Sequence, residues 1–222
     1  MSANAHTQIA VVDYGVNNVG SVLNMLRRIG IETVTAKRPV DLAEGTAIVL
    51  PGIGAFDAGV ASLRQTGLFD ALRAAVIERR VPILGICLGM QLLTRGSDEG
   101  KLEGLGLVPA TTKRITFAEA EHSFKIPHMG WNETVCLDRE LFADLVNARF
   151  YYVHSYHVAC DTPSDVAARC SYGGDLTAAV RRGHVMGTQF HPEKSHRFGM
   201  QVLTNFARLA RAHARPQVAA SA

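Results

Sequence analysis

Short apolar runs alternate with amphipathic stretches in the first half of the chain. The strand-like segments are IAVV (9–12), ETVTA (32–36), AIVL (47–50) and PILGI (82–86). The stretches whose apolar residues share one helical face are 19–29, 59–80 and 88–95. Continuous apolar runs are typical of strands buried on both faces, as in a parallel sheet covered by helices. The pattern therefore predicts an α/β domain with a central, mainly parallel sheet flanked by helices.

The second half changes to short β-type segments separated by glycine and proline turns. These segments are LGLV (105–108), TVCL (134–137), RFYYVHSY (149–156), VAARC (166–170), TAAV (177–180) and VMGTQF (185–190). A last amphipathic helix is predicted over 195–212, and additional antiparallel strands are expected before it. Because no linker or repeat interrupts the chain, we expect a single domain over 1–222, with its core at about 8–210 and ragged polar termini.

Composition narrows the functional classes. The 222 residues are 47% hydrophobic, and the formal net charge is only +3, with scattered basic residues, so we expect neither nucleic acid nor membrane as a partner. The N-terminal MSANAHTQ has no signal-peptide pattern. Four widely spaced cysteines without a CxxC pair favour reduced cytoplasmic thiols over disulfides or a zinc site. We therefore predict a cytoplasmic protein without a metal.

GICLGMQLL (85–93) places Cys87 between two glycines, where a buried strand ends and a helix begins. Gly-x-nucleophile-x-Gly at such a junction is typical of a sharp turn that exposes a nucleophile at the carboxyl edge of the sheet. The amides at the start of the following helix stabilise a thiolate. Taken alone, this stretch favours the interpretation of Cys87 as a small buried hydrophobic residue.

GTQFHPEKS (187–195) supplies a candidate base with an orienting partner. His191 follows an apolar strand, and Pro192 favours an extended backbone there. In an extended segment His191 and Glu193 project to the same side, so the carboxylate can hydrogen-bond the imidazole and fix its tautomer. The alternative is a surface turn that begins the last helix.

PGIG (51–54) follows another buried strand. Its glycines allow backbone amides to turn toward a developing oxyanion, although an ordinary strand-terminal turn would look the same. His128 in KIPHMGW and His154 in YYVHSY lie among aromatic residues, and either packing or an interface would explain them.

Together, these stretches resemble the class I glutamine amidotransferase family, and more narrowly the glutaminase subunits of imidazole glycerol phosphate synthases. The matching motifs, in family order, are PGIGAF (51–56), GICLGMQLL (85–93), IPHMGWN (126–132), YYVHSY (151–156) and QFHPEKS (189–195). GxCxGxQ and HPE are shared by amidotransferases in general, whereas PHMGWN and VHSY narrow the resemblance. It covers about residues 8–210 and implies the class I amidotransferase fold.

The resemblance implies a Cys-His-Glu triad that hydrolyses glutamine without a cofactor. Cys87 would form a glutamyl thioester and release ammonia, His191 would act as general base and acid, and Glu193 would orient His191. The other implied site residues are the oxyanion residues Gly52, Ile53, Gly54 and Leu88, and the glutamine-binding residues Gln91, Ser155 and Tyr156.

The resemblance also implies a partner. Ammonia would pass to a (β/α)8 cyclase subunit, which makes imidazole glycerol phosphate and an aminoimidazole-carboxamide ribotide (AICAR) in histidine biosynthesis. Asn18, His128 and Trp131 would lie on the partner face. One departure is DYGVNN (13–18), where Asn17 replaces the family's usual glycine. Asparagine tolerates left-handed backbone better than most residues, so the loop can keep its shape.

Three alternatives stay open at this point. Related glutaminases are thought to supply ammonia for amidino-sugar formation in surface polysaccharides, and EKSHRFGM (193–200) resembles them. A stand-alone cysteine hydrolase could use the same fold and triad. A catalytically silent binding module is disfavoured, since all three triad residues are present.

Overall fold

The computed structural model describes residues 8–117 and 124–214, and its centre is an eight-stranded sheet. In spatial order its strands are β2 (Glu32–Ala36), β1 (Gln8–Val12), β3 (Ala47–Gly52), β4 (Ile83–Cys87), β12 (Val185–Thr188), β11 (Asp175–Arg182), β10 (Val166–Ser171) and β7 (Val135–Cys136). The first five are parallel to one another, and the last three add on antiparallel. The predicted α/β class is therefore confirmed.

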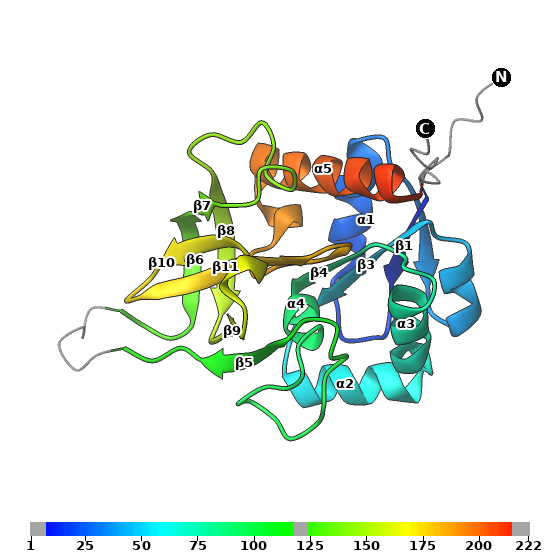
Figure 1. Cartoon of the computed structure of the whole chain (residues 1–222), viewed down its shortest axis with the longest axis horizontal. Helices are drawn as coiled ribbons and strands as arrows, with labels where there is room; N and C mark the ends of the chain where they lie inside the picture. Colours follow the sequence, from blue (N-terminus) through cyan, green and yellow to red (C-terminus); the bar gives the residue numbers. More distant parts are fainter. Residues whose placement is uncertain (1–7, 118–123, 215–222) are drawn as a thin grey trace, which may run out of the picture.

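Helices cover both faces of the parallel half (Figure 1). They are α1 (Val19–Arg28), α2 (Phe56–Gln65), α3 (Leu68–Ile77), α4 (Leu88–Leu92) and α5 (His196–Ala214). Alternate residues of β1 serve the two sides: Ile9 and Val11 pack with α1 and α5, whereas Ala10 and Val12 pack with α2, α3 and α4. Burial on both faces explains why the parallel strands read as continuous apolar runs.

Two smaller antiparallel pairs lie beside the main sheet, at the left of Figure 1. One pairs β5 (Ala110–Arg114) with β9 (Tyr156–Cys160), and the other pairs β6 (His128–Glu133) with β8 (Arg149–His154). The turn between β8 and β9 carries Ser155. Strands from the second half thus reach the carboxyl edge of the parallel strands, where ligands usually bind in such sheets.

The structure corrects three details of the predicted elements. The amphipathic stretch 59–80 forms two helices, because Gly67 takes a left-handed backbone (φ 71°) between α2 and α3. LGLV (105–108) forms no strand, and its hydrogen bonds run to the end of α4 instead. The helix predicted over 88–95 ends at Leu92. Apolar content alone did not distinguish a buried loop from a strand.

Three short 3₁₀ segments, η1 (Pro39–Ala43), η2 (Pro163–Asp165) and η3 (Pro192–Lys194), each begin at a proline. The described part of the chain contains no helix long and apolar enough to cross a membrane. The predicted ragged termini lie outside the described residues. The single-domain organisation stays a prediction, which the sheet shared by both hydrophobic clusters supports.

Candidate active site

Cys87 lies on a strained turn between β4 and α4. Its backbone angles, φ 55° and ψ −111°, are rare for a residue with a side chain, and such strain concentrates at functional sites. A methyl group on Gly89 would overlap the carbonyl oxygen of Leu50, and one on Gly85 would lie 2.6 Å from the Gly89 carbonyl carbon. Both flanking glycines are therefore required by close backbone contacts, as the elbow pattern predicts.

His191, just before η3, and Glu193, within η3, form a buried hydrogen-bonded pair. The distance from His191 Nδ1 to Glu193 Oε1 is 2.8 Å, and the two side chains are only 2% and 3% exposed. The Ser195 hydroxyl donates to the His191 carbonyl, and the His191 amide donates to the Tyr151 carbonyl. The proline-directed segment thus holds the imidazole and the carboxylate on the same side, as predicted from the sequence.

The charge state of His191 follows from its neighbours. Burial lowers the pKa of the imidazole, but the Cys87 sulfur and the Glu193 carboxylate raise it more, and the result is a pKa of about 10. The His191 Nε2 atom has no hydrogen-bond partner of normal geometry among the described residues. The raised pKa favours the charged form of the ring at neutral pH, and one of its N–H groups donates to Glu193.

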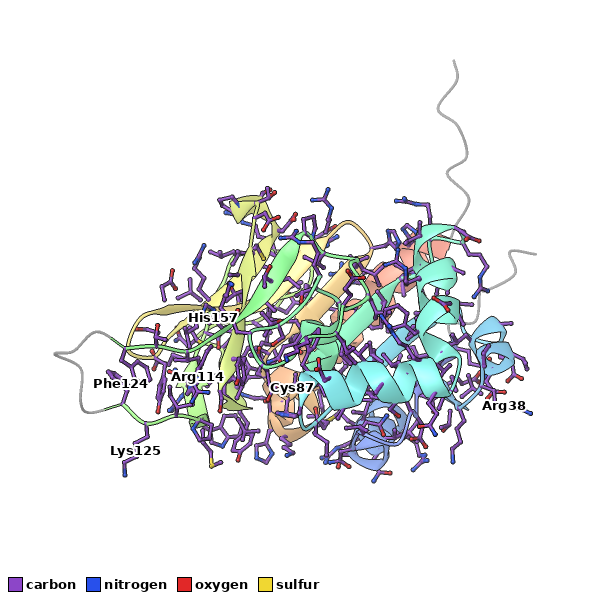
Figure 2. All side chains as sticks on the ribbon, turned by 90° about the horizontal axis from the view of Figure 1, so that it is seen from below. Arg38, Cys87, Arg114, Phe124, Lys125 and His157 are labelled. Atoms are coloured by element: carbon purple, nitrogen blue, oxygen red, sulfur yellow. The ribbon has the colours of Figure 1, made fainter. Side chains whose placement is uncertain are left out.

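Strand order brings these groups to one cavity of about 340 Å³. Cys87 ends β4, and His191 follows β12, which pairs with β4. In Figure 2 Cys87 lies near the middle of the molecule's length, with Arg38 toward one end and Phe124 toward the other. The predicted residues that line the cavity are Ile53, Gly54, Cys87, Leu88, Gln91, Ser155, Tyr156 and His191.

In the segment predicted to bind an oxyanion, the backbone amide of the central residue, Ile53, already donates a hydrogen bond within the protein. The Ile53 amide donates to the Val16 carbonyl at 3.3 Å, although the Ile53 side chain is 44% exposed at the cavity. Gly52 pairs with Cys87 across β3 and β4, and Gly54 has φ 89°. The Leu88 amide, at the first position of α4, follows the nucleophile directly. In this conformation, Ile53 cannot donate into the cavity.

The side chain of Asn17 stabilises the first loop through a hydrogen bond that the sequence did not predict. Its side-chain amide donates to the Val12 carbonyl at 2.9 Å. The residue of this loop with a left-handed backbone is Gly15, with φ 87°. The tolerance of asparagine for left-handed backbone is therefore not needed here.

Two polar side chains near Cys87 were not singled out from the sequence. Gln189 donates through Nε2 to the Cys87 sulfur at 3.8 Å. Glu99 lines the cavity, and its Oε2 accepts a hydrogen bond from the Phe56 amide at 2.9 Å. Gln189 lies within the matching motif QFHPEKS, so the motif itself carried a signal, whereas nothing in the sequence around Glu99 pointed to the cavity.

The three residues predicted on the partner face differ in exposure. Trp131 is 42% exposed, and Asn18 is half-buried. His128 is only 2% exposed, so in this conformation it packs inside the protein and cannot touch a partner directly. Exposed Met129 flanks Trp131 on β6. Within 8–117 and 124–214, no group of three or more His, Cys, Asp or Glu side chains is arranged to hold a metal ion.

Comparison with known proteins then decides the family. Residues 10–209 match the family "Glutamine amidotransferase class-I". The chain belongs to the class I glutamine amidotransferase family. The matched range includes the β4–α4 turn, the PGIG segment and the HPE segment, so the residues around the cavity lie within it.

Relatives and solved structures agree with this assignment. An imidazole glycerol phosphate synthase subunit HisH 2 from Methanococcus maripaludis is 43% identical, over 91% of this chain and 100% of its own length. A protein of the same name from Pseudomonas aeruginosa is 44% identical, over 90% and 99%. A glutamine amidotransferase crystal structure superposes with a TM-score of 0.72 at 21% identity, covering 90% of this chain and 98% of its own. PurLQS from Thermotoga maritima superposes with a TM-score of 0.68 at 21% identity, covering 91% and 98%. At such identities the structures support the fold alone.

Proposed function

We propose that this chain is the glutaminase subunit of an imidazole glycerol phosphate synthase. It hydrolyses glutamine to glutamate and ammonia, and the ammonia passes to a (β/α)8 cyclase subunit that makes imidazole glycerol phosphate and AICAR in histidine biosynthesis. The observation that carries the proposal is the cavity shared by Cys87 and His191, with Glu193 on the imidazole. Relatives that bear this subunit's name and cover 90% or more of the chain support the pathway.

The reaction begins when the Cys87 sulfur attacks the side-chain carbonyl carbon of glutamine. The new C–S bond places negative charge on the carbonyl oxygen, and the C–N bond breaks as His191 gives a proton to the leaving nitrogen. Ammonia leaves and a glutamyl thioester remains. Water then attacks the thioester, His191 takes its proton, and the C–S bond breaks to release glutamate. Glu193 keeps the imidazole oriented and stabilises its charge.

The cavity walls suit the two ends of glutamine. The Glu99 carboxylate is the acidic group of the lining and would bind the α-ammonium of the substrate. The lining residues Ser155 and Tyr156 come from the turn where β8 meets β9, and Gln91 lies one helical turn after Cys87. The Gln91 Nε2 group already donates to the Tyr156 carbonyl and to Gln189, so its oxygen is the atom left for a substrate.

An oxyanion site requires a rearrangement near PGIG. The Ile53 amide must leave the Val16 carbonyl before it can join the Leu88 amide as a donor to the oxyanion. Gly52 and Gly54 supply the backbone freedom for this rotation. The chain alone would then turn over slowly, and partner binding near Asn18 and the first loop would favour the active conformation.

A channelled product explains the need for a partner. Free ammonia in neutral water is mostly protonated and no longer nucleophilic, so a water-excluding path to the cyclase preserves its reactivity. Exposed Trp131 and Met129 on β6 are suited to contact that subunit. Cys87, Cys136, Cys160 and Cys170 are all free thiols, which supports a cytoplasmic location.

The decisive experiment mixes the purified chain with a histidine-pathway cyclase and, separately, with an amidino-sugar partner enzyme. We expect the histidine-pathway cyclase to raise glutamine hydrolysis, and we expect Cys87→Ala to abolish it while added ammonium salt still supports the cyclase. If Cys87→Ala kept full turnover, Cys87 would not be the nucleophile. Stimulation only by the other partner would assign the polysaccharide pathway, and high turnover by the isolated chain would indicate a stand-alone hydrolase.

A further inference from the structure

The hydroxyl of Tyr14, a residue of the first loop, is a buried donor without a partner beside the active site. Tyr14 is 2% exposed, and its hydroxyl oxygen has no hydrogen-bond partner among the described residues. A methyl group built on Gly52 would lie 2.5 Å from this oxygen and 2.9 Å from the Gly89 amide nitrogen. The hydroxyl therefore lies against the oxyanion segment (51–54), next to the turn that carries Cys87. The proposed reaction does not use it.

The surrounding structure fixes Tyr14 in this position. The Asp13 amide donates to the Ala36 carbonyl at 2.8 Å, and the Ser62 hydroxyl donates to the Tyr14 carbonyl. The ring belongs to the apolar cluster on the α2–α3 side of the sheet. Burial and then the Cys87 sulfur raise the pKa of the Tyr14 hydroxyl well above its ordinary value, so it keeps its proton. An unpaired buried hydroxyl destabilises the folded chain, and such a group calls for an explanation.

The oxyanion segment supplies one, because its central peptide must rotate. In the conformation described here, called the resting conformation, the Ile53 amide donates to the Val16 carbonyl at 3.3 Å. The N–H and C=O groups of a trans peptide point in opposite directions, so the Gly52 carbonyl points away from Val16. Rotation that turns the Ile53 amide toward the cavity therefore turns the Gly52 carbonyl toward the first loop. A buried carbonyl in that position needs a donor.

The Tyr14 hydroxyl is suited to be that donor. Among the described residues, the other buried side-chain polar atoms without a partner belong to His157, His191 and Glu193, and none of these is in the first loop. Gly52 has no left-handed backbone in the resting conformation, so the nearby hydroxyl explains why no side chain fits there. The rotating carbonyl moves around this same α-carbon, and no Cβ separates it from the hydroxyl.

We propose that Tyr14 is a positioning residue, which holds the Gly52–Ile53 peptide in its active orientation by donating a hydrogen bond to the rotated Gly52 carbonyl. The first loop then serves both conformations: Val16 accepts from Ile53 in the resting one, and Tyr14 donates to Gly52 in the active one. Asn18 ends this loop on the proposed partner face, so docking of the cyclase can favour the active conformation through it. The inference rests on the proposed glutaminase function.

Tyr14→Phe tests this role because it removes only the hydroxyl. The active conformation is a minor state of the isolated chain, so its population should fall about tenfold with the loss of one hydrogen bond. We expect kcat of the isolated chain for glutamine to fall by the same factor, with KM changed by less than about twofold. The resting conformation loses no hydrogen bond, so the urea midpoint of unfolding should be unchanged or higher.

Tyr152→Phe is the matched control. Tyr152 is fully buried, and its hydroxyl is 2.6 Å from the Thr134 hydroxyl, so the same change breaks an existing hydrogen bond. We expect this variant to have a lower urea midpoint and a kcat within about twofold of the wild type. The positioning role of Tyr14 would be overturned if Tyr14→Phe kept kcat within twofold. It would also be overturned if kcat fell together with a drop in urea midpoint like that of Tyr152→Phe.

Hydrogen exchange of the Ile53 amide, followed by NMR on the isolated chain, tests the role without any activity. This amide exchanges when it leaves the Val16 carbonyl, so its rate reports the population of the rotated peptide. We expect about tenfold slower exchange in Tyr14→Phe, and an unchanged rate at the Gly67 amide, which donates to the Arg64 carbonyl at the end of α2. An unchanged Ile53 rate would overturn the proposal. A wild-type chain that hydrolyses no glutamine, alone or with the cyclase, would instead overturn the proposed function, and the exchange rates would still decide the role of Tyr14.

Discussion

Thr188 of β12 lies opposite Ile86 of β4 in parallel register. Cys87 follows Ile86 directly, and His191 follows Thr188 after a short extended segment, so adjacent strands deliver both residues to one edge of the sheet. On the other side of β4, Cys87 itself pairs with Gly52 of β3. Three neighbouring strands thus hold the nucleophile, its base and the oxyanion segment. Residues that are far apart in the sequence therefore lie close together at one edge of the sheet.

Replacing Glu193 by glutamine should impair the base without removing it. The amide cannot stabilise the charged imidazole as the carboxylate does, so the pKa of His191 should fall from its raised value of about 10. We expect kcat for glutamine to drop by about 10²-fold or more in the complex with the cyclase. Steady-state kinetics and an NMR titration of His191 measure both effects. Glu78→Gln, at an exposed carboxylate, is the control and should change neither.

His191 should make stability depend on pH on the alkaline side. Its pKa rises from 6.5 to about 10 on folding, so between these values the folded chain holds a proton that the unfolded chain releases. The stabilisation is complete below pH 6.5 and is lost as the pH rises through about 10. The free energy of unfolding in urea should therefore fall more steeply from pH 7 to 10 for the wild type than for His191→Gln. Parallel pH profiles of the two proteins would contradict the raised pKa.

The buried pair of His128 and His154 should make stability depend on pH on the acid side. The pKa values of His128 and His154 are lowered to about 4 and about 3, so below pH 6.5 the unfolded chain binds protons that the folded chain excludes. Stability should then decrease as the pH falls from 6.5. His128→Asn has one such ring fewer, and it should lose less free energy of unfolding between pH 6.5 and 4.5, by up to about 1.4 kcal/mol per pH unit. An identical acid slope in the variant would argue against a buried neutral His128.

Gly89→Ala should destabilise the whole fold as well as the elbow. The added methyl would overlap the backbone carbonyl of Leu50, and neither β3 nor α4 can shift without disturbing the core. We expect the free energy of unfolding to fall by about 3 kcal/mol or more, measured by urea denaturation. Gly20→Ala, in α1 with no atom within 4 Å of the new methyl, is the matched control. It should be neutral or more stable by about 0.5–1 kcal/mol.

Much of the fold could be predicted from the pattern of the sequence. The apolar runs at β1, β3 and β4 are typical of strands covered on both faces, and the helical spacing between them predicts a parallel sheet. Neighbouring residues also pointed to Cys87, because glycines flank it at a strand–helix junction. They pointed to the His191–Glu193 pair as well, because the proline between the two favours an extended backbone. These features depend on residues close together in the chain.

What only the tertiary structure decided concerns contacts between distant segments. Periodicity could not say that His128 is buried against His154, that Ile53 donates to Val16, or that Gln189 faces the Cys87 sulfur. Each of these contacts depends on strand register and on which hydrogen-bonding group lies opposite. The identity of a residue does not specify which distant residue will lie next to it. The sequence by itself therefore determined the α/β class and the local elbow and HPE geometry. The assembled cavity, the state of the oxyanion segment and the buried histidine pair arise from the packing of strands that are remote in the chain.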